Sequence, residues 1–114
     1  MSEWNSEDDK LAVLAKGARS RVQANVGAAL RDETGRTYAS AEISIGSLTL
    51  SGVEMVVAQA VASGSAGVES VVISSNSKIS FTESDIELVR TFAGTGIPLY
   101  IIDETGKPID SRLT

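Results

Sequence analysis

Cysteine and histidine are both absent from this chain of 114 residues. Without cysteine, the protein forms no disulfide and has neither a thiolate metal ligand nor a cysteine nucleophile. Without histidine, it also lacks the commonest general base and the commonest zinc ligand. Few kinds of enzyme can be built from the residues that remain.

Aromatic and basic residues are scarce as well. Aromatic side chains make up only 4% of the chain, so its core must consist mainly of Ala, Val, Ile and Leu, which suit close packing of helices on a sheet. The 10 Lys and Arg residues are outnumbered by 15 Asp and Glu residues, which gives a net charge of -5. Because this charge has the wrong sign for neutralising phosphates, we expect no nucleic acid as the primary ligand.

Long apolar segments are missing too. The longest run without charge, residues 55–68, is shorter than the ~18 apolar residues of a membrane-spanning helix. The N-terminus carries Glu3, Asp8 and Asp9 and lacks the basic start and apolar stretch of a signal peptide. We therefore expect one cytoplasmic domain, residues 1–114, with no membrane partner.

The spacing of apolar residues predicts a helix followed by a hairpin. Helical spacing predicts a first helix over residues 7–19, with Ser6 as its N-cap. Strict alternation then predicts strands over residues 22–31 and 36–45. The turn residues at 32–35 predict that these two strands pair antiparallel.

A second helix is expected over residues 50–63, which are apolar on nearly every side. One small sheet covers only one side of such a helix. We therefore expect the other side to contact a partner subunit in a homo-oligomer, either a dimer or a tetramer.

A third helix is expected to begin at Thr82 as its N-cap. Asp85 stands three positions later, as in a capping box, and Phe81 is placed to pack on Ile86 as a hydrophobic staple. This combination predicts a structural role for Thr82.

The remaining segments complete an α/β pattern. Strands are expected at residues 68–75 and 97–103, with a short last one near Ile109. The order α-β-β-α-β-α-β(-β) predicts a mixed sheet, with an antiparallel hairpin, parallel later strands and helices on its faces. The Ser-rich segment 74–80 is expected to be a solvated connection.

Several short matches to a known family occur in the order of these elements. Residues 26–30 are Val-Gly-Ala-Ala-Leu, Gly35 lies in the turn, Tyr38 and Ile43 follow, and Ala60 and Val61 precede Gly64. In this order and spacing they resemble the first strand, hairpin turn, second strand and central-helix end of the cytidine deaminases, which are small zinc-dependent nucleoside deaminases. The resemblance covers residues 7–106 and implies a three-layer fold.

The resemblance implies a zinc site that this sequence does not complete. In the family, the central helix begins with a Cys or His ligand followed by the catalytic Glu, and the third helix begins with two Cys ligands. The alignment places the first ligand and the Glu at Ser51 and Val53, or alternatively at Val53 and Met55. It places the cysteine pair at Thr82 and Asp85. Only Asp85 suits zinc, so we expect no metal and no cofactor.

The family's substrate-binding positions differ here as well. The resemblance places Glu42 and Ser44 where the family has Asn and Glu, and Ala24 where it has Phe. Glu54, one position from the expected catalytic carboxylate, is the candidate for residual catalysis, because a buried carboxylate with a raised pKa is a good proton shuttle. We favour a structural role instead, because one residue rotates a helical side chain by ~100°.

Three functional hypotheses follow. The leading one is an oligomeric binding or interaction module of the cytidine deaminase fold, without zinc and without catalysis. The enzymatic alternative is a cytidine or nucleoside deaminase, as the resemblance implies. The third is a sensor that binds a nucleoside or nucleotide in the cleft of the fold.

Other polar or aromatic features receive structural interpretations. Asp32 with Glu33 and Asp103 with Glu104 are expected as solvated turns, although such pairs also occur in sites for hard cations. Trp4 is expected to pack against the first helix.

Overall fold

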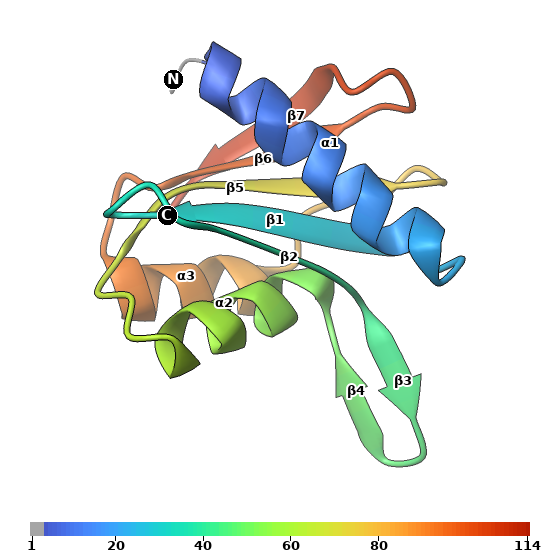
Figure 1. Cartoon of the computed structure of the whole chain (residues 1–114), viewed down its shortest axis with the longest axis horizontal. Coiled ribbons are helices and arrows are strands. Elements are labelled where there is room, and N and C mark those ends of the chain that lie inside the picture. The colour runs from blue at the N-terminus through green and yellow to red at the C-terminus, as the bar shows by residue number, and fades with distance from the viewer. Residues whose placement is uncertain (1–3) are drawn as a thin grey trace.

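The protein forms a three-layer α/β fold, which confirms the expected fold class. In the computed structural model, which describes residues 4–114, a mixed sheet of order β2-β1-β5-β6-β7 has α1 on one face and α2 and α3 on the other (Figure 1). The elements are α1 (Ser6–Arg21), β1 (Val26–Asp32), β2 (Thr37–Ala41), β3 (Ile43–Ile45), β4 (Leu48–Leu50), α2 (Gly52–Ala62), β5 (Val68–Ser75), α3 (Glu83–Ala93), β6 (Pro98–Ile102) and β7 (Pro108–Leu113). Among the strands of residues 4–114, only β5 and β6 pair parallel. Glu3 lies outside the described residues.

The first helix begins and ends differently from the prediction. Its N-cap is Asn5 and not Ser6, because the Asn5 side chain accepts from the Asp8 N–H while the Asp8 carboxylate accepts from the Asn5 N–H. The helix runs on to Arg21, and Gln23, with φ of 58°, turns the chain into β1. The alternation that begins at Val22 therefore lies partly outside the strand, and Val22 is 64% exposed.

The predicted strand at 36–45 is divided in two. β2 pairs with β1, and the Glu42 N–H still donates to the Val26 carbonyl. Because β1 begins at Val26, it has no further residue that could pair with the chain beyond Glu42. β3 pairs instead with β4, a strand that the sequence analysis did not predict.

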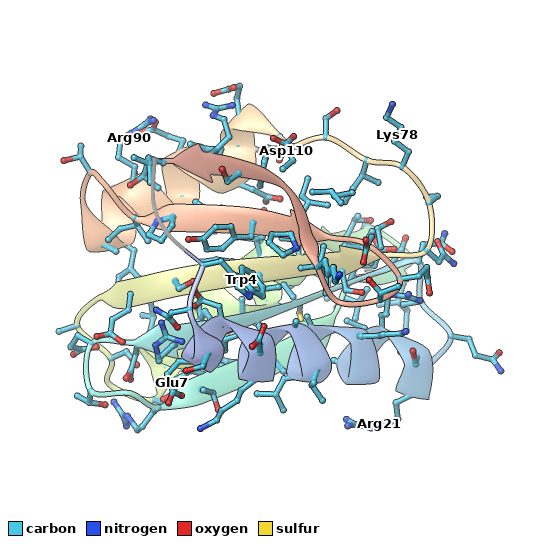
Figure 2. The ribbon with its side chains drawn as sticks, turned by 90° about the horizontal axis from the view of Figure 1, so that it is seen from above. Trp4, Glu7, Arg21, Lys78, Arg90 and Asp110 are labelled. Atoms are coloured by element: carbon cyan, nitrogen blue, oxygen red, sulfur yellow. The ribbon has the colours of Figure 1, made fainter. Side chains whose placement is uncertain are left out.

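Each face of the sheet has its own apolar cluster. On the α1 face, Leu11 and Ala15 pack with Val72, Tyr100 and Ile102. Trp4 joins this cluster by an edge-on contact with Tyr100, with ring centroids 5.0 Å apart, and its indole N–H donates to Asp9 of α1 (Figure 2). Trp4 therefore contacts the first helix, as expected, and also the sheet.

The opposite face of the sheet covers one side of α2. Val56, Val57 and Ala60 are 0%, 3% and 0% exposed within the one chain, in a cluster that also contains sheet and α3 residues. α3 covers part of the surface that the sheet leaves free, whereas Ala58, Val61 and Ala62 remain exposed. The uncovered apolar side of this helix is therefore narrower than predicted. No helix in residues 4–114 is long and apolar enough to cross a membrane.

Candidate functional site

One small cavity lies where α2 and α3 begin. Both helices precede parallel strands, so both start at the edge of the sheet where β5 ends. In open α/β sheets, this carboxyl edge of the strands is the usual place for a ligand. The cavity has a volume of about 180 Å³. Its polar lining residues are Glu42, Ser51, Ser80, Thr82 and Asp85.

A hydrogen bond joins the starts of the two helices. The Ser51 hydroxyl donates to the Asp85 carboxylate over 2.8 Å and accepts from the Glu54 N–H over 3.0 Å. Ser51 is thus the N-cap of α2 and also a link to α3. This link fixes two of the polar lining residues relative to each other.

Thr82 is the N-cap of α3, as predicted. Its hydroxyl oxygen accepts from the Asp85 N–H over 3.2 Å. The expected capping box is only half formed, because the Asp85 carboxylate accepts from Ser51 across the cavity. Phe81 and Ile86, the expected staple, pack in the same apolar cluster.

The structure brings four of the six candidate residues to this cavity and leaves two outside it. Glu54 is not among its lining residues; the Glu54 carboxylate accepts from the Ser51 N–H over 2.7 Å and completes a capping box. Ser44 lies on the β3–β4 hairpin, where its hydroxyl is 3.3 Å from that of Thr49. Glu42 lines the cavity and accepts from the Val26 N–H over 3.2 Å.

The side chains in the cavity do not fit a zinc ion. Zinc is bound by thiolate, imidazole or carboxylate groups, usually four in a structural site and three in a catalytic one. At the three positions where the resemblance places ligands, Ser51 and Thr82 offer neutral hydroxyl groups and only Asp85 offers a carboxylate. In the alternative register the first position is Val53, which offers no ligand atom. Within residues 4–114, no group of three or more acidic side chains is placed to hold a metal.

One wall of the cavity was not expected from the sequence. Ile79 and Ser80 line it, although the segment 74–80 was expected to be a solvated connection. Ile79 packs against the same apolar cluster as Phe81. The sequence offered one sign of this wall, because the large apolar residues Ile79 and Phe81 lie within and directly after the Ser-rich segment.

Asp32 of the first acidic turn is buried, whereas a solvated pair was expected; Glu33, Thr34 and Gly35 are exposed. Asp32 is 0% exposed and accepts from the hydroxyls of Ser65 (2.6 Å) and Thr34 (2.7 Å) and from the Arg36 side chain (3.0 Å). Burial alone would raise the pKa of this carboxyl group, but its hydrogen bonds hold the pKa well below the usual value. Glu33 accepts from the N–H groups of residues 66 and 67. The pair therefore anchors a turn.

A wider groove of about 580 Å³ lies between α1 and the β6–β7 turn. Its charged rim is paired internally, because Glu104 accepts from Arg19 over 3.0 Å and from Lys16 through its backbone carbonyl over 2.6 Å. None of the candidate residues lines it. The smaller cavity remains the candidate site.

Solved structures of cytidine deaminases share this architecture. A family model described as cytidine deaminase-like matches residues 4–106. The cytidine deaminase from Burkholderia pseudomallei superposes with a TM-score of 0.76 at 18% identity, covering 92% of this chain and 89% of that one. The enzyme from Mycobacterium leprae gives 0.72 at 17% identity, covering 92% and 91%. A variant of the Mycobacterium tuberculosis enzyme gives 0.67 at 20%, covering 98% and 91%. No curated protein sequence is significantly similar to the chain.

Proposed function

Because the chain belongs to the cytidine deaminase-like family, we propose that it is a member that neither holds zinc nor hydrolyses cytidine, and that it acts as an oligomeric binding module. The observation that carries the proposal is the hydrogen bond between Ser51 and Asp85. Two side chains aligned with metal ligands bond directly to each other. A hydroxyl and a carboxylate paired in this way stabilise the helix starts and leave no ligand set for a metal.

The position of Glu54 supports the same proposal. A proton shuttle must reach the reacting atoms, either within hydrogen-bond distance or through one water. The Glu54 carboxylate instead accepts a hydrogen bond at the start of α2, outside the lining of the cavity. Val53 and Met55, the two positions where the resemblance places the catalytic Glu, have no proton to transfer, and of the two only Val53 is among the described lining residues.

The test is metal analysis followed by an activity assay. The full chain, purified without added metal, is expected to contain no stoichiometric zinc and to convert no cytidine or deoxycytidine to the uridine product above background. One zinc per chain together with measurable turnover would establish the deaminase alternative.

A matched variant makes that test informative. Replacing Ser51, Thr82 and Asp85 together by Cys supplies three thiolates at the aligned positions and is expected to give a protein that binds one zinc. Zinc in this variant and none in the natural chain would trace the difference to these side chains. The control is a second triple variant, in which the exposed residues Glu7, Lys10 and Glu87 are replaced by Cys. It measures nonspecific zinc binding by three thiols.

A second candidate function is the binding of a small neutral or cationic molecule in the same cavity. Glu42 and Asp85 contribute carboxylates, and no basic side chain is among the described lining residues, so a phosphate group would be repelled by two side chains with no cation to offset them. Ligand cavities usually span about 300–1,000 Å³, so one of about 180 Å³ suits a molecule the size of a nucleobase. The small volume and the two carboxylates of the cavity therefore favour a base or nucleoside over a nucleotide as the ligand.

A further inference from the structure

A separate cavity of about 330 Å³ lies where the parallel strands β5 and β6 end. The loop that follows β5, in which Figure 2 labels Lys78, forms one side of it, and residues of β6 and β7 form the other. Ligands of open α/β sheets usually bind at the carboxyl ends of the strands, in cavities of about 300–1,000 Å³. This cavity meets both conditions.

The apolar lining of this cavity consists of isoleucine side chains, which are Ile79, Ile101, Ile102 and Ile109. Ile101 and Ile102 are buried and Ile79 is half-buried, whereas Ile109 is 62% exposed. The chain therefore leaves apolar surface in water beside its own core. A ligand that covers this surface gains the free energy of its burial.

A β-bulge places Ile109 at the cavity. Ile101 pairs with Asp110 and Ile102 pairs with Pro108, so Ile109 has no paired residue on β6. A bulge redirects a side chain, and bulges are over-represented next to active sites. The exposure of Ile109 is thus a consequence of the strand pairing itself.

The loop on the other side of the cavity is held by hydrogen bonds. The Asn76 N–H donates to the Asn25 carbonyl over 3.0 Å, and the Asn76 side-chain amide donates to that of Asn25 over 3.0 Å. The Ser77 N–H donates to the Ser75 hydroxyl oxygen over 3.2 Å. The cavity is therefore largely preformed, as ligand sites usually are.

Lys78 is the cation of this cavity, and it has no counter-ion within residues 4–114. The two acidic lining residues are bonded elsewhere. The Asp103 carboxylate accepts hydrogen bonds from its own turn, and the Glu104 carboxylate pairs with Arg19 over 3.0 Å. A single negative charge at the rim of the cavity would therefore find an unpaired ammonium group.

We propose that this cavity binds an aliphatic monocarboxylate, with the hydrocarbon chain on the isoleucine side chains and the carboxylate at Lys78. The proposal goes beyond the proposed function, because none of the residues aligned with the deaminase site lines this cavity. A phosphate group carries more negative charge than one exposed lysine offsets beside two carboxylates. One carboxylate on an apolar chain matches both the walls and the charge.

A series of straight-chain carboxylates tests the apolar contact. Butanoate, hexanoate and octanoate are titrated into the isotope-labelled full chain, and the shifts of its amide resonances give the affinity and the location together. The largest shifts are expected in residues 76–79 and 101–104. Each buried methylene tightens binding by up to about fourfold, so octanoate is expected to bind at least about tenfold more tightly than butanoate.

Ile109→Glu is the main variant, because it replaces an apolar wall by a carboxylate. It is expected to weaken octanoate binding by at least about tenfold. Val13→Glu is the matched control, since Val13 is 72% exposed on α1 and lines only the wider groove. This control is expected to bind octanoate as the natural chain does.

Lys78→Gln tests the charge. An exposed ion pair contributes little, so octanoate binding is expected to weaken by about two- to fivefold, whereas binding of the neutral octanol is expected to stay the same. Lys10→Gln removes another exposed lysine, on α1, and is expected to change neither affinity. The amide spectra also report whether each variant is folded, and Ile109→Ser replaces Ile109→Glu if that variant is not.

The remaining outcomes overturn the proposal. Octanoate that causes no shift at millimolar concentration, or that binds Val13→Glu as weakly as Ile109→Glu, would remove the ligand from this cavity. Equal binding of octanol and octanoate, unchanged in Lys78→Gln, would overturn the assignment of a carboxylate. The zinc and cytidine assays concern the other cavity, so their results stand in either case.

Discussion

Thr82 stabilises the start of α3 through a local hydrogen bond, in which its hydroxyl oxygen accepts from the Asp85 N–H. Replacing Thr82 by Ala leaves that N–H without its partner, so the free energy of unfolding is expected to fall by about 0.5–2 kcal/mol. Thr82→Ser retains the hydroxyl and is expected to stay close to the natural chain. Urea denaturation measures both. Unchanged stability of Thr82→Ala combined with altered ligand binding would indicate a functional role instead.

Asp32 and Asp103 occupy two turns with the same sequence, Asp-Glu-Thr-Gly, but in different surroundings. In both turns the carboxylate accepts from the Thr hydroxyl and from backbone N–H groups. Only Asp32 is fully buried and also bonded to Ser65. Asp32→Asn is therefore expected to lower the thermal stability at neutral pH more than Asp103→Asn does.

The same carboxyl groups predict how stability depends on pH. The pKa of Asp32 is lower in the folded chain than in the unfolded chain, and hydrogen bonds from Thr105 and Lys107 lower that of Asp103 in the same direction. Their contribution is complete above the unfolded pKa of about 4 and is lost as the pH falls below it. Thermal unfolding between neutral pH and about pH 2 is expected to show a smaller acid loss for Asp32→Asn than for the natural chain. Parallel curves for the two proteins would contradict this account.

At the level of single residues, local patterns were readable from the sequence and distant contacts were not. The Thr82 cap depends on residues within four positions, so its pattern is visible in one short segment. The burial of Asp32 depends on Ser65, 33 positions away, and nothing in the repeated turn sequence distinguishes it from Asp103. The link from Ser51 to Asp85 spans 34 positions and was equally hidden.

α1 packs on β1 with almost no space between the two backbones. A Cβ atom added at Gly27 would lie 2.5 Å from the Ala15 carbonyl oxygen and 2.9 Å from the Arg19 Cβ. Because the helix backbone itself blocks that position, Gly27→Ala is expected to cost about 1–3 kcal/mol of unfolding free energy or more.

A second glycine provides the matched control for this packing. Gly17 lies within α1, and a Cβ there would meet no atom within 4 Å. Gly17→Ala is expected to stabilise the protein by about 0.5–1 kcal/mol, since Ala favours a helix interior. Chemical denaturation measures the free energy of unfolding of both variants. An unchanged free energy for Gly27→Ala would contradict the close approach of α1 to β1.

Elements defined by their own periodicity were predicted well, and elements defined by their partner were not. The segments of α2, α3, β5 and β6 have patterns or end signals within themselves, and all four lie close to their predicted ranges. The alternation across residues 36–45 is the same whether Ile43 and Ile45 pair with β1 or with a later strand. The β3–β4 hairpin was therefore missed, because the choice of partner depends on where β1 begins.

In the whole molecule, the parallel arrangement of β5 and β6 creates the candidate site. It places the starts of α2 and α3 at one edge of the sheet, so that Ser51 and Asp85 meet. The alternation of helices and strands predicted this layering. The resemblance to a known family pointed to four of the five polar lining residues, which composition alone did not single out.

The charge of the whole molecule adds to that of the cavity in selecting its ligand. A chain of net charge -5 and a cavity with two carboxylates both repel phosphate. Cytosine or cytidine at a hundred times its Kd is therefore expected to raise the Tm by roughly 10 °C, whereas cytidine monophosphate is expected to give little or no shift. Glu42→Gln should reduce the shift with cytosine, and Glu69→Gln, which is exposed on β5 outside the cavity, should not. A shift with the monophosphate equal to that with cytidine, or no shift with any of the three, would contradict ligand binding at this site.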